Sequence, residues 1–231
     1  MTSATGVAAG LDEDRRRRPT ELASDVLLIR HGQTNCTIEG RFCGVHEGDL
    51  TEVGRQMARR LGRHPALDGV GTVLSSPARR AFQTAEAIAG RLGVAVAVDE
   101  RLRELSFGQW EDRLPSEVPA DLHRRWECDP ALFCPPGGET GLEVMARAVA
   151  AVRDAALSAP RVAVVTHKAP VRLVLAFFLG LRPSRYREIG PITVGSLSWL
   201  RLNGDRLLLK ALGDVGHLPE PWRADPDRAG S

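Results

Sequence analysis

Two apolar runs of this sequence end directly in a histidine that could act on phosphate. Residues 26–29 lead into Arg30 and His31, and residues 162–165 lead into a Thr-His pair that ends at His167. A histidine that lies among cations stays neutral more readily than an isolated one. Neutral imidazole keeps a lone pair that can attack phosphorus, so both histidines are candidates for phosphoryl chemistry.

Two further runs lead into a second arginine and a carboxylic acid. The stretch SSPARRAFQTA, which contains Arg80, follows the apolar run 72–74, and Glu104 comes shortly after the run 94–98. The guanidinium groups of Arg30 and Arg80 could bind phosphoryl oxygens through paired hydrogen bonds. A glutamic acid beside a bound phosphate has a raised pKa and can protonate a leaving oxygen.

The elements that must position these residues alternate between strands and helices. Strands are expected at 26–29, 72–74, 94–98 and 162–165, and helices at 51–61, 78–92, 143–157 and 171–179. This alternation is typical of a parallel sheet that helices cover on both faces. The stretch SLSWLRLNGDRLLLKAL adds a hairpin around Asn203-Gly204, which is expected to form an antiparallel edge. The predicted fold is therefore an α/β three-layer sandwich with a mostly parallel central sheet.

The predicted sheet brings the candidate residues together. In open parallel α/β sheets, ligands bind beyond the carboxyl ends of the strands. Each candidate follows the end of an expected strand, so we expect them to lie along one rim: Arg30, His31, Arg80, Glu104 and His167.

One domain is expected at residues 25–213, between two tails. Residues 1–24, with a run of four arginines, predict a flexible N-terminal tail, and the proline-containing residues 214–231 predict a C-terminal tail. Residues 107–138 carry five prolines and fit the strand–helix rhythm poorly, so they predict a small lid. The aromatic side chains of this lid are expected to pack within it.

Composition argues against several classes of protein. The net charge of +2, from 31 basic and 29 acidic residues, gives no argument for nucleic-acid binding. No apolar run approaches the roughly 18 residues of a membrane span, and no secretory signal is recognisable. The four cysteines form no CxxC pair, so a zinc site is not expected. Without an export signal, the cysteines are expected to be reduced thiols. These points favour a cytoplasmic protein without a nucleic-acid or membrane partner; they do not indicate its oligomeric state.

The motifs together resemble the histidine phosphatase superfamily, also called the phosphoglycerate mutase-like family. The resemblance covers about residues 25–212 and depends on six motifs in the family's order: LIRHGQT, LTEVGRQMA, SSPARRAFQTA, LRELSFGQWE, FCPPGGET and VVTHKAPVR. Each motif alone is weak, whereas the ordered set is highly specific for the family, and the short lid region favours its phosphatase-type branch.

The resemblance implies a role for each matching residue. His31 would be the nucleophile that becomes a phosphohistidine, and Arg30 and Arg80 would hold the phosphoryl oxygens. Glu104 would be the general acid towards the leaving alcohol and then the base for water. His167 would hydrogen-bond the phosphoryl group. The resemblance implies neither a metal nor a cofactor.

Two positions depart from the family pattern. Thr37 stands where members often have asparagine, and its hydroxyl can still bind a phosphate oxygen. Lys168 stands where glycine is common. Its backbone N–H can still point at phosphate, and its ammonium could bind either the phosphoryl group or a second anionic group.

The resulting hypothesis is a phosphomonoesterase for a small phosphorylated metabolite whose identity the sequence does not indicate. Phosphoglycerate mutase-like phosphoryl transfer is one alternative, which Arg124 and Arg125 keep open. Mutases of the family carry a longer basic insertion, however, and only about thirty residues separate Gly108 from PPGGE. A non-catalytic phospho-ligand binder is the other alternative, and Lys168 is the feature in its favour.

Overall fold

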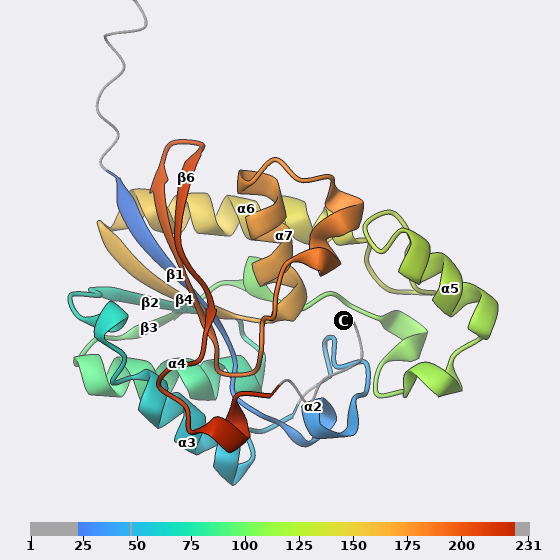
Figure 1. The fold of residues 1–231 in the computed structure, drawn as a ribbon, viewed down its shortest axis with the longest axis horizontal. Coiled ribbons are helices and arrows are strands. Elements are labelled where there is room, and N and C mark those ends of the chain that lie inside the picture. Colours follow the sequence, from blue (N-terminus) through green and yellow to red (C-terminus); the bar gives the residue numbers. More distant parts are fainter. Residues whose placement is uncertain (1–22, 47, 225–231) are drawn as a thin grey trace, which may run out of the picture.

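The computed structural model describes residues 23–46 and 48–224, in which helices enclose a mixed sheet of six strands (Figure 1). The strand order is β3-β2-β4-β1-β5-β6. The strands are β1 Ser24–Arg30, β2 Thr72–Ser75, β3 Val96–Val98, β4 Arg161–Thr166, β5 Leu197–Asn203 and β6 Arg206–Asp214. The helices are α2 Asn35–Glu39, α3 Glu52–Leu61, α4 Arg79–Leu92, α5 Ala120–Cys128, α6 Gly141–Ser158 and α7 Lys168–Phe178.

The first four strands run parallel, so their carboxyl ends share one rim. β4 pairs with β1 and with β2, and β2 pairs with β3, all in parallel. At the rim, Arg30 lies opposite Thr166, and Ser75 lies opposite both Val165 and Val98. β5 and β6 complete the sheet as an antiparallel edge. The predicted mostly parallel sheet with an antiparallel C-terminal hairpin is confirmed.

Helices cover both faces of the sheet, which explains why β1 is apolar without interruption. Leu27 and Ile29 pack on the face that α3 and α4 cover, whereas Val26 and Leu28 pack on the face that α6 and α7 cover. Alternate side chains of a strand point to opposite faces, so a strand covered twice needs apolar residues at every position. Figure 1 shows the two helical layers on opposite sides of the strands.

Local sequence explains the helix ends that border the site. The hydroxyl of Thr51 accepts a hydrogen bond from the N–H of Gly54 and caps α3, as predicted. α7 begins at Lys168 and not near residue 171, because Pro170 lies in the first helical turn, where proline needs no N–H partner. The hairpin turn is Gly204-Asp205, one residue later than expected.

Residues 107–138, for which a small lid is expected, contain a helix that was not predicted from the sequence. α5 follows Pro119, which precedes its first turn. The rings of Trp110 and Phe133 stack at 5.9 Å between centroids, and Trp126 meets Phe42 edge to face at 5.6 Å. Both tryptophans are buried, so the predicted packing role of the lid aromatics is confirmed.

The cysteines correct one expectation. Cys36 and Cys43 form a disulfide, so the prediction of reduced thiols is wrong for this pair. Their Cα atoms lie 6.1 Å apart, within the range that a disulfide spans. Cys128 and Cys134 are free and exposed. Among the described residues, no helix is both long and apolar enough to cross a membrane.

The two predicted tails are described only in part. Residues 1–22, including the arginine run, and residues 225–231 lie outside the described part of the chain. β1 already includes Ser24. Beyond β6, Leu218 is buried against Met57, and Trp222 packs against the same cluster, so this part of the C-terminal segment wraps the surface of the domain.

Candidate active site

His31 lies at the carboxyl end of β1 in a fixed orientation. Its Nδ1 atom is 2.7 Å from the carbonyl oxygen of Gly32. A carbonyl can only accept, so Nδ1 carries the proton and Nε2 keeps a lone pair. Nε2 in turn accepts from the Nε–H of Arg80 at 3.2 Å. Burial lowers the pKa of His31 well below 6.5, and the charges of Arg80 and Arg30 lower it further.

Gly32 and Gly54 explain how α3 comes so close to this strand end. A Cβ on Gly32 would overlap the carbonyl oxygen of Gly54, and a Cβ on Gly54 would overlap that of Gln33. The N–H of Gly32 donates to the hydroxyl of Thr84 at 3.1 Å. The glycine after His31 therefore permits a close approach of backbone to backbone.

Arg80 is buried in the first turn of α4, with its guanidinium directed at the site. It donates to the carbonyl oxygens of His46 at 2.7 Å, Gly44 at 2.6 Å and Cys43 at 3.2 Å. Arg79 instead lies on the surface, where it pairs with Asp49 at 2.8 Å. The structure thus places the second arginine of the motif, and not the first, beside His31.

Arg30 is the second buried guanidinium of the rim. Its Nη1 donates to the carbonyl oxygen of Ile192 at 2.7 Å, and its charge contributes to the lowered pKa of His31 and of His167. Thr37 lies nearby in chain order but caps α2: its hydroxyl accepts from the N–H of Thr34 at 3.0 Å in a capping box and donates to the carbonyl oxygen of Thr34 at 2.8 Å. A phosphate contact by Thr37 stays a prediction.

His167 lies at the end of β4 and faces His31. Its Nε2 atom is 2.8 Å from the hydroxyl of Ser76, and its Nδ1 has no hydrogen-bond partner among the described residues. Burial lowers its pKa well below 6.5, and the charges of Arg80 and His31 act in the same direction. A buried ring nitrogen without a hydrogen bond costs free energy, and a ligand that binds this nitrogen would remove that cost.

Glu104 is buried at the same rim, between two backbone segments. One carboxyl oxygen accepts from the backbone N–H of Leu105 at 2.8 Å. The other accepts from the backbone N–H groups of Lys168 at 3.1 Å and Ala169 at 3.4 Å. Burial raises the pKa of Glu104, while these bonds and the charge of Arg80 oppose the rise. A carboxyl group with a raised pKa suits proton donation near neutral pH.

Arg147 on α6 holds the backbone that carries Glu104. It donates to the carbonyl oxygens of Arg101 at 2.8 Å, Arg103 at 2.6 Å and Glu104 at 2.9 Å. Glu139 from the FCPPGGET motif accepts from Arg147 at 2.9 Å. Neither residue was singled out from the sequence, although the motif that contains Glu139 was.

Lys168 is the buried first residue of α7, and its N–H points at Glu104 and not into open space. Its side chain helps to line a cavity that also borders Glu104. The other lining residues are cationic or aromatic for the most part: Arg41, Phe42, Phe107, Trp126, Arg172 and Tyr186. Within the described residues, no group of three or more His, Cys, Asp or Glu could hold a metal.

Two comparisons of sequence identify relatives. The profile of the "Histidine phosphatase superfamily (branch 1)" matches residues 26–215. A glucosyl-3-phosphoglycerate phosphatase of Mycolicibacterium vanbaalenii is 32% identical over 213 residues, which are 87% of this chain and 92% of the relative. The bifunctional protein Rv2228c of Mycobacterium tuberculosis is 37% identical over 171 residues, which are 71% of this chain. The match covers 45% of that relative, so the chain spans less than half its length.

Solved structures show the same fold. Bacillus stearothermophilus YhfR superimposes with a TM-score of 0.79 at 29% identity, over 84% of this chain and 98% of that one. The mycobacterial glucosyl-3-phosphoglycerate phosphatase Rv2419c gives 0.75 at 27% identity, over 83% of this chain and 99% of that one. With a family profile that spans nearly the whole described domain, the chain belongs to the histidine phosphatase superfamily.

Proposed function

We propose that this protein is a phosphomonoesterase that hydrolyses a small phosphorylated metabolite through a phosphohistidine at His31. The observation that carries the proposal is the orientation of the His31 ring. Its Nδ1 proton is bound by the carbonyl oxygen of Gly32, so that the Nε2 lone pair lies beside Arg80. Relatives named as phosphatases support the same class of reaction.

In the first step, Nε2 of His31 would attack phosphorus while the bond to the leaving oxygen breaks. Arg30 and Arg80 would bind the phosphoryl oxygens and stabilise the charge that develops on them. Glu104, whose pKa burial raises, would in its protonated form give its proton to the leaving oxygen, so that a neutral alcohol departs.

In the second step, Glu104 is a carboxylate and would take a proton from water as the water attacks the phosphohistidine. The P–N bond breaks, which releases inorganic phosphate and restores neutral His31 and protonated Glu104. Ser76 accepts from the N–H of Ala78 at 3.3 Å, so its own hydrogen can go to Nε2 of His167. Nδ1 of His167 would then carry a hydrogen that it can donate to the phosphoryl group.

Thr37 and Lys168 are also assigned to the proposed phosphate site. The Thr37 hydroxyl would have to turn from the carbonyl oxygen of Thr34 to reach a phosphate oxygen. Lys168 borders the cavity beside Glu104, on the side where the leaving group would extend. Its ammonium therefore has two candidate ligands, the phosphoryl group and a second anionic group.

The mutase alternative gains no support from the lid. Arg124 and Arg125 are both exposed on α5, and neither lines the cavity that borders Glu104. Arg125 instead lies over the ring of Phe133 at 5.3 Å. The non-catalytic alternative, a protein that binds a phosphorylated ligand without turnover, is disfavoured. The proposed nucleophile, the proposed acid and two guanidinium groups all lie at one rim.

The proposal includes metal-independent chemistry, because the rim holds histidines and arginines and no carboxylate cluster of the kind that holds Mg²⁺. Release of phosphate from p-nitrophenyl phosphate tests the phosphatase activity. The same rate after dialysis against EDTA would support its independence of metal. A large loss that one metal restores would contradict the mechanism. A panel of phosphorylated metabolites would then identify the substrate, and a bisphosphate donor would reveal any mutase activity.

A cytoplasmic location belongs to the proposal as well, and the Cys36–Cys43 disulfide is the feature that bears against it. Such bonds are rare where glutathione keeps thiols reduced. Titration of thiols in protein taken from cells under acid quench would show two thiols if the disulfide forms there and four if it does not, since Cys128 and Cys134 are free.

A further inference from the structure

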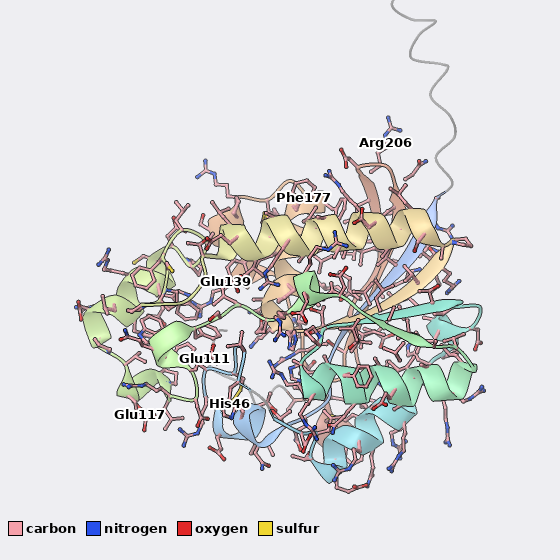
Figure 2. All side chains as sticks on the ribbon, turned by 180° about the vertical axis from the view of Figure 1, so that it is seen from behind. His46, Glu111, Glu117, Glu139, Phe177 and Arg206 are labelled. Carbon is pink, nitrogen blue, oxygen red and sulfur yellow. A yellow bond between two sulfur atoms is a disulfide. The ribbon has the colours of Figure 1, made fainter. Side chains whose placement is uncertain are left out.

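Glu111 is a carboxylate that the proposed mechanism does not use, although it binds backbone beside the site. One of its oxygens accepts from the N–H groups of Val45 at 3.1 Å and Phe107 at 2.7 Å, and the other accepts from Gly44 at 3.0 Å and His46 at 3.2 Å. A carboxylate has about four acceptor positions, so these bonds use its capacity. Figure 2 shows Glu111 on the lid and His46 on the adjoining loop.

The opposite side of this loop holds Arg80. The guanidinium donates to the carbonyl oxygens of Cys43, Gly44 and His46, and two of these residues, Gly44 and His46, also give their N–H groups to Glu111. The loop 43–46 is therefore bound on one side by a carboxylate and on the other by a guanidinium. Any shift of its backbone changes both sets of bonds together.

The local sequence makes this arrangement specific. The N–H of Phe42 donates to the carbonyl oxygen of Arg113 at 2.9 Å, and the N–H of Asp112 donates to that of Phe42 at 3.0 Å, which brings Glu111 alongside the loop. Gly44 is required there, because a Cβ would overlap the carboxylate of Glu111 and the carbonyl oxygen of Leu105. The contact between Glu111 and loop 43–46 therefore depends on the sequence of the loop and on that of the segment around Glu111.

We infer that Glu111 is a positioning residue for phosphoryl binding, which acts through loop 43–46 on the guanidinium of Arg80. The chain of contacts ends at the nucleophile, since Nε of Arg80 lies 3.2 Å from Nε2 of His31. The inference rests on the proposed function, because it assigns Arg80 to the phosphoryl oxygens. A residue that only stabilised the lid would change the unfolding temperature and leave the affinity of the folded protein for phosphate unaltered.

Glu111→Gln tests this inference, because it replaces one oxygen with an NH₂ group that faces two N–H donors. Two hydrogen bonds are lost, at least one of them to the loop, so the loop is held less tightly on the side away from Arg80. The inhibition constants of orthovanadate and inorganic phosphate should rise roughly 10- to 100-fold, the range of a lost hydrogen bond to a charged group. The value of kcat/KM should fall by one common factor for alkyl and aryl phosphates, since Arg80 binds the group they share.

Glu143→Gln is the matched control. Glu143 also accepts from a backbone N–H, that of Thr140 at 2.8 Å, but at the start of α6 and away from the loop. It should leave both inhibition constants unchanged. In an Arg80→Ala background, Glu111→Gln should change the inhibition constants by less than about twofold, because the effects of coupled residues are not additive.

Unchanged inhibition constants in folded Glu111→Gln would overturn the inference, as would full additivity with Arg80→Ala. If Glu111→Gln does not fold, Glu111→Asp takes its place, because the shorter side chain withdraws the carboxylate from the loop. If neither variant folds, Glu111 is a residue of fold stability alone and the inference is wrong. A wild-type protein that neither hydrolyses a phosphomonoester nor binds vanadate would instead refute the proposed function.

Discussion

The rings of His31 and His167 meet edge to face, with centroids 5.1 Å apart, yet they are held by different partners. His31 is bound through Nδ1 to a backbone carbonyl, whereas His167 is bound through Nε2 to the hydroxyl of Ser76. Both rings are buried and have lowered pKa values, so burial does not distinguish them. Their hydrogen bonds do, because His31 alone of the two presents its Nε2 lone pair to Arg80.

This difference predicts where a phosphoryl group is trapped. Rapid quench with labelled substrate should give an acid-labile, base-stable label on His31, and His31→Ala should remove both label and turnover. His167→Ala should slow turnover but still permit labelling, because the nucleophile is intact. Mass spectrometry of the quenched protein locates the label. Label on His167, or undiminished turnover in His31→Ala, would contradict the assignment.

The burial of Glu104 predicts an effect that depends on the leaving group. Glu104→Gln should slow hydrolysis of an alkyl phosphate by roughly 10²–10⁴-fold, as is usual for a general acid. It should slow hydrolysis of p-nitrophenyl phosphate less, because that leaving group needs little protonation. Glu100→Gln, an exposed change close in the chain, serves as the control and should alter neither. Equal losses on both substrates would mean that Glu104 positions the substrate and does not donate the proton.

The pKa shifts predict a pH profile with two limbs. His31 must be neutral to attack, and its pKa lies well below 6.5, so kcat/KM should hold until the pH falls well below that value. Glu104 must be protonated, and its pKa is raised above 4.5, so kcat/KM should fall as the pH rises through the raised pKa. Glu104→Gln should remove the alkaline limb and keep the acid one. An alkaline limb that persists in this variant would assign it to another group.

The rim could be predicted from the sequence because its residues come directly after buried strands. The apolar runs before His31 and His167 are long enough to indicate strands covered on both faces, and parallel strands bring the residues at their carboxyl ends to one side of the sheet. Arg80 and Glu104 could be assigned through the motifs that contain them. These predictions depend on residue types, which the sequence shows directly.

Contacts to backbone groups could not be predicted in the same way. Glu111 binds the N–H of Gly44 across 67 positions, and any residue type carries such an N–H, so no pattern of letters indicates the contact. Arg147 reaches the carbonyl oxygen of Glu104 across 43 positions for the same reason. The Cys36–Cys43 disulfide was missed because spacing alone does not give the distance between two Cα atoms.

Lys168 leads to the last prediction, because its N–H binds the proposed general acid and both residues line the same cavity. If its ammonium binds a second anionic group of the substrate, Lys168→Gly should raise KM for that substrate and leave kcat unchanged. KM for an analogue with a neutral leaving group should barely change, since that analogue never used the interaction. Such a pattern marks the loss of binding that is equal in ground state and transition state.

Two further variants separate the possible roles of Lys168. Lys168→Met keeps most of the apolar stem, so a loss shared by both variants reports the charge and not the packing. Lys210→Met removes the other lysine of the chain, which pairs with Asp25 at 3.3 Å, and should leave both constants unchanged. If kcat falls alike for every substrate in Lys168→Gly, the ammonium contacts the transferred phosphoryl group. If neither constant changes, Lys168 has no part in binding, and the specificity for the leaving group must come from the other residues of the cavity.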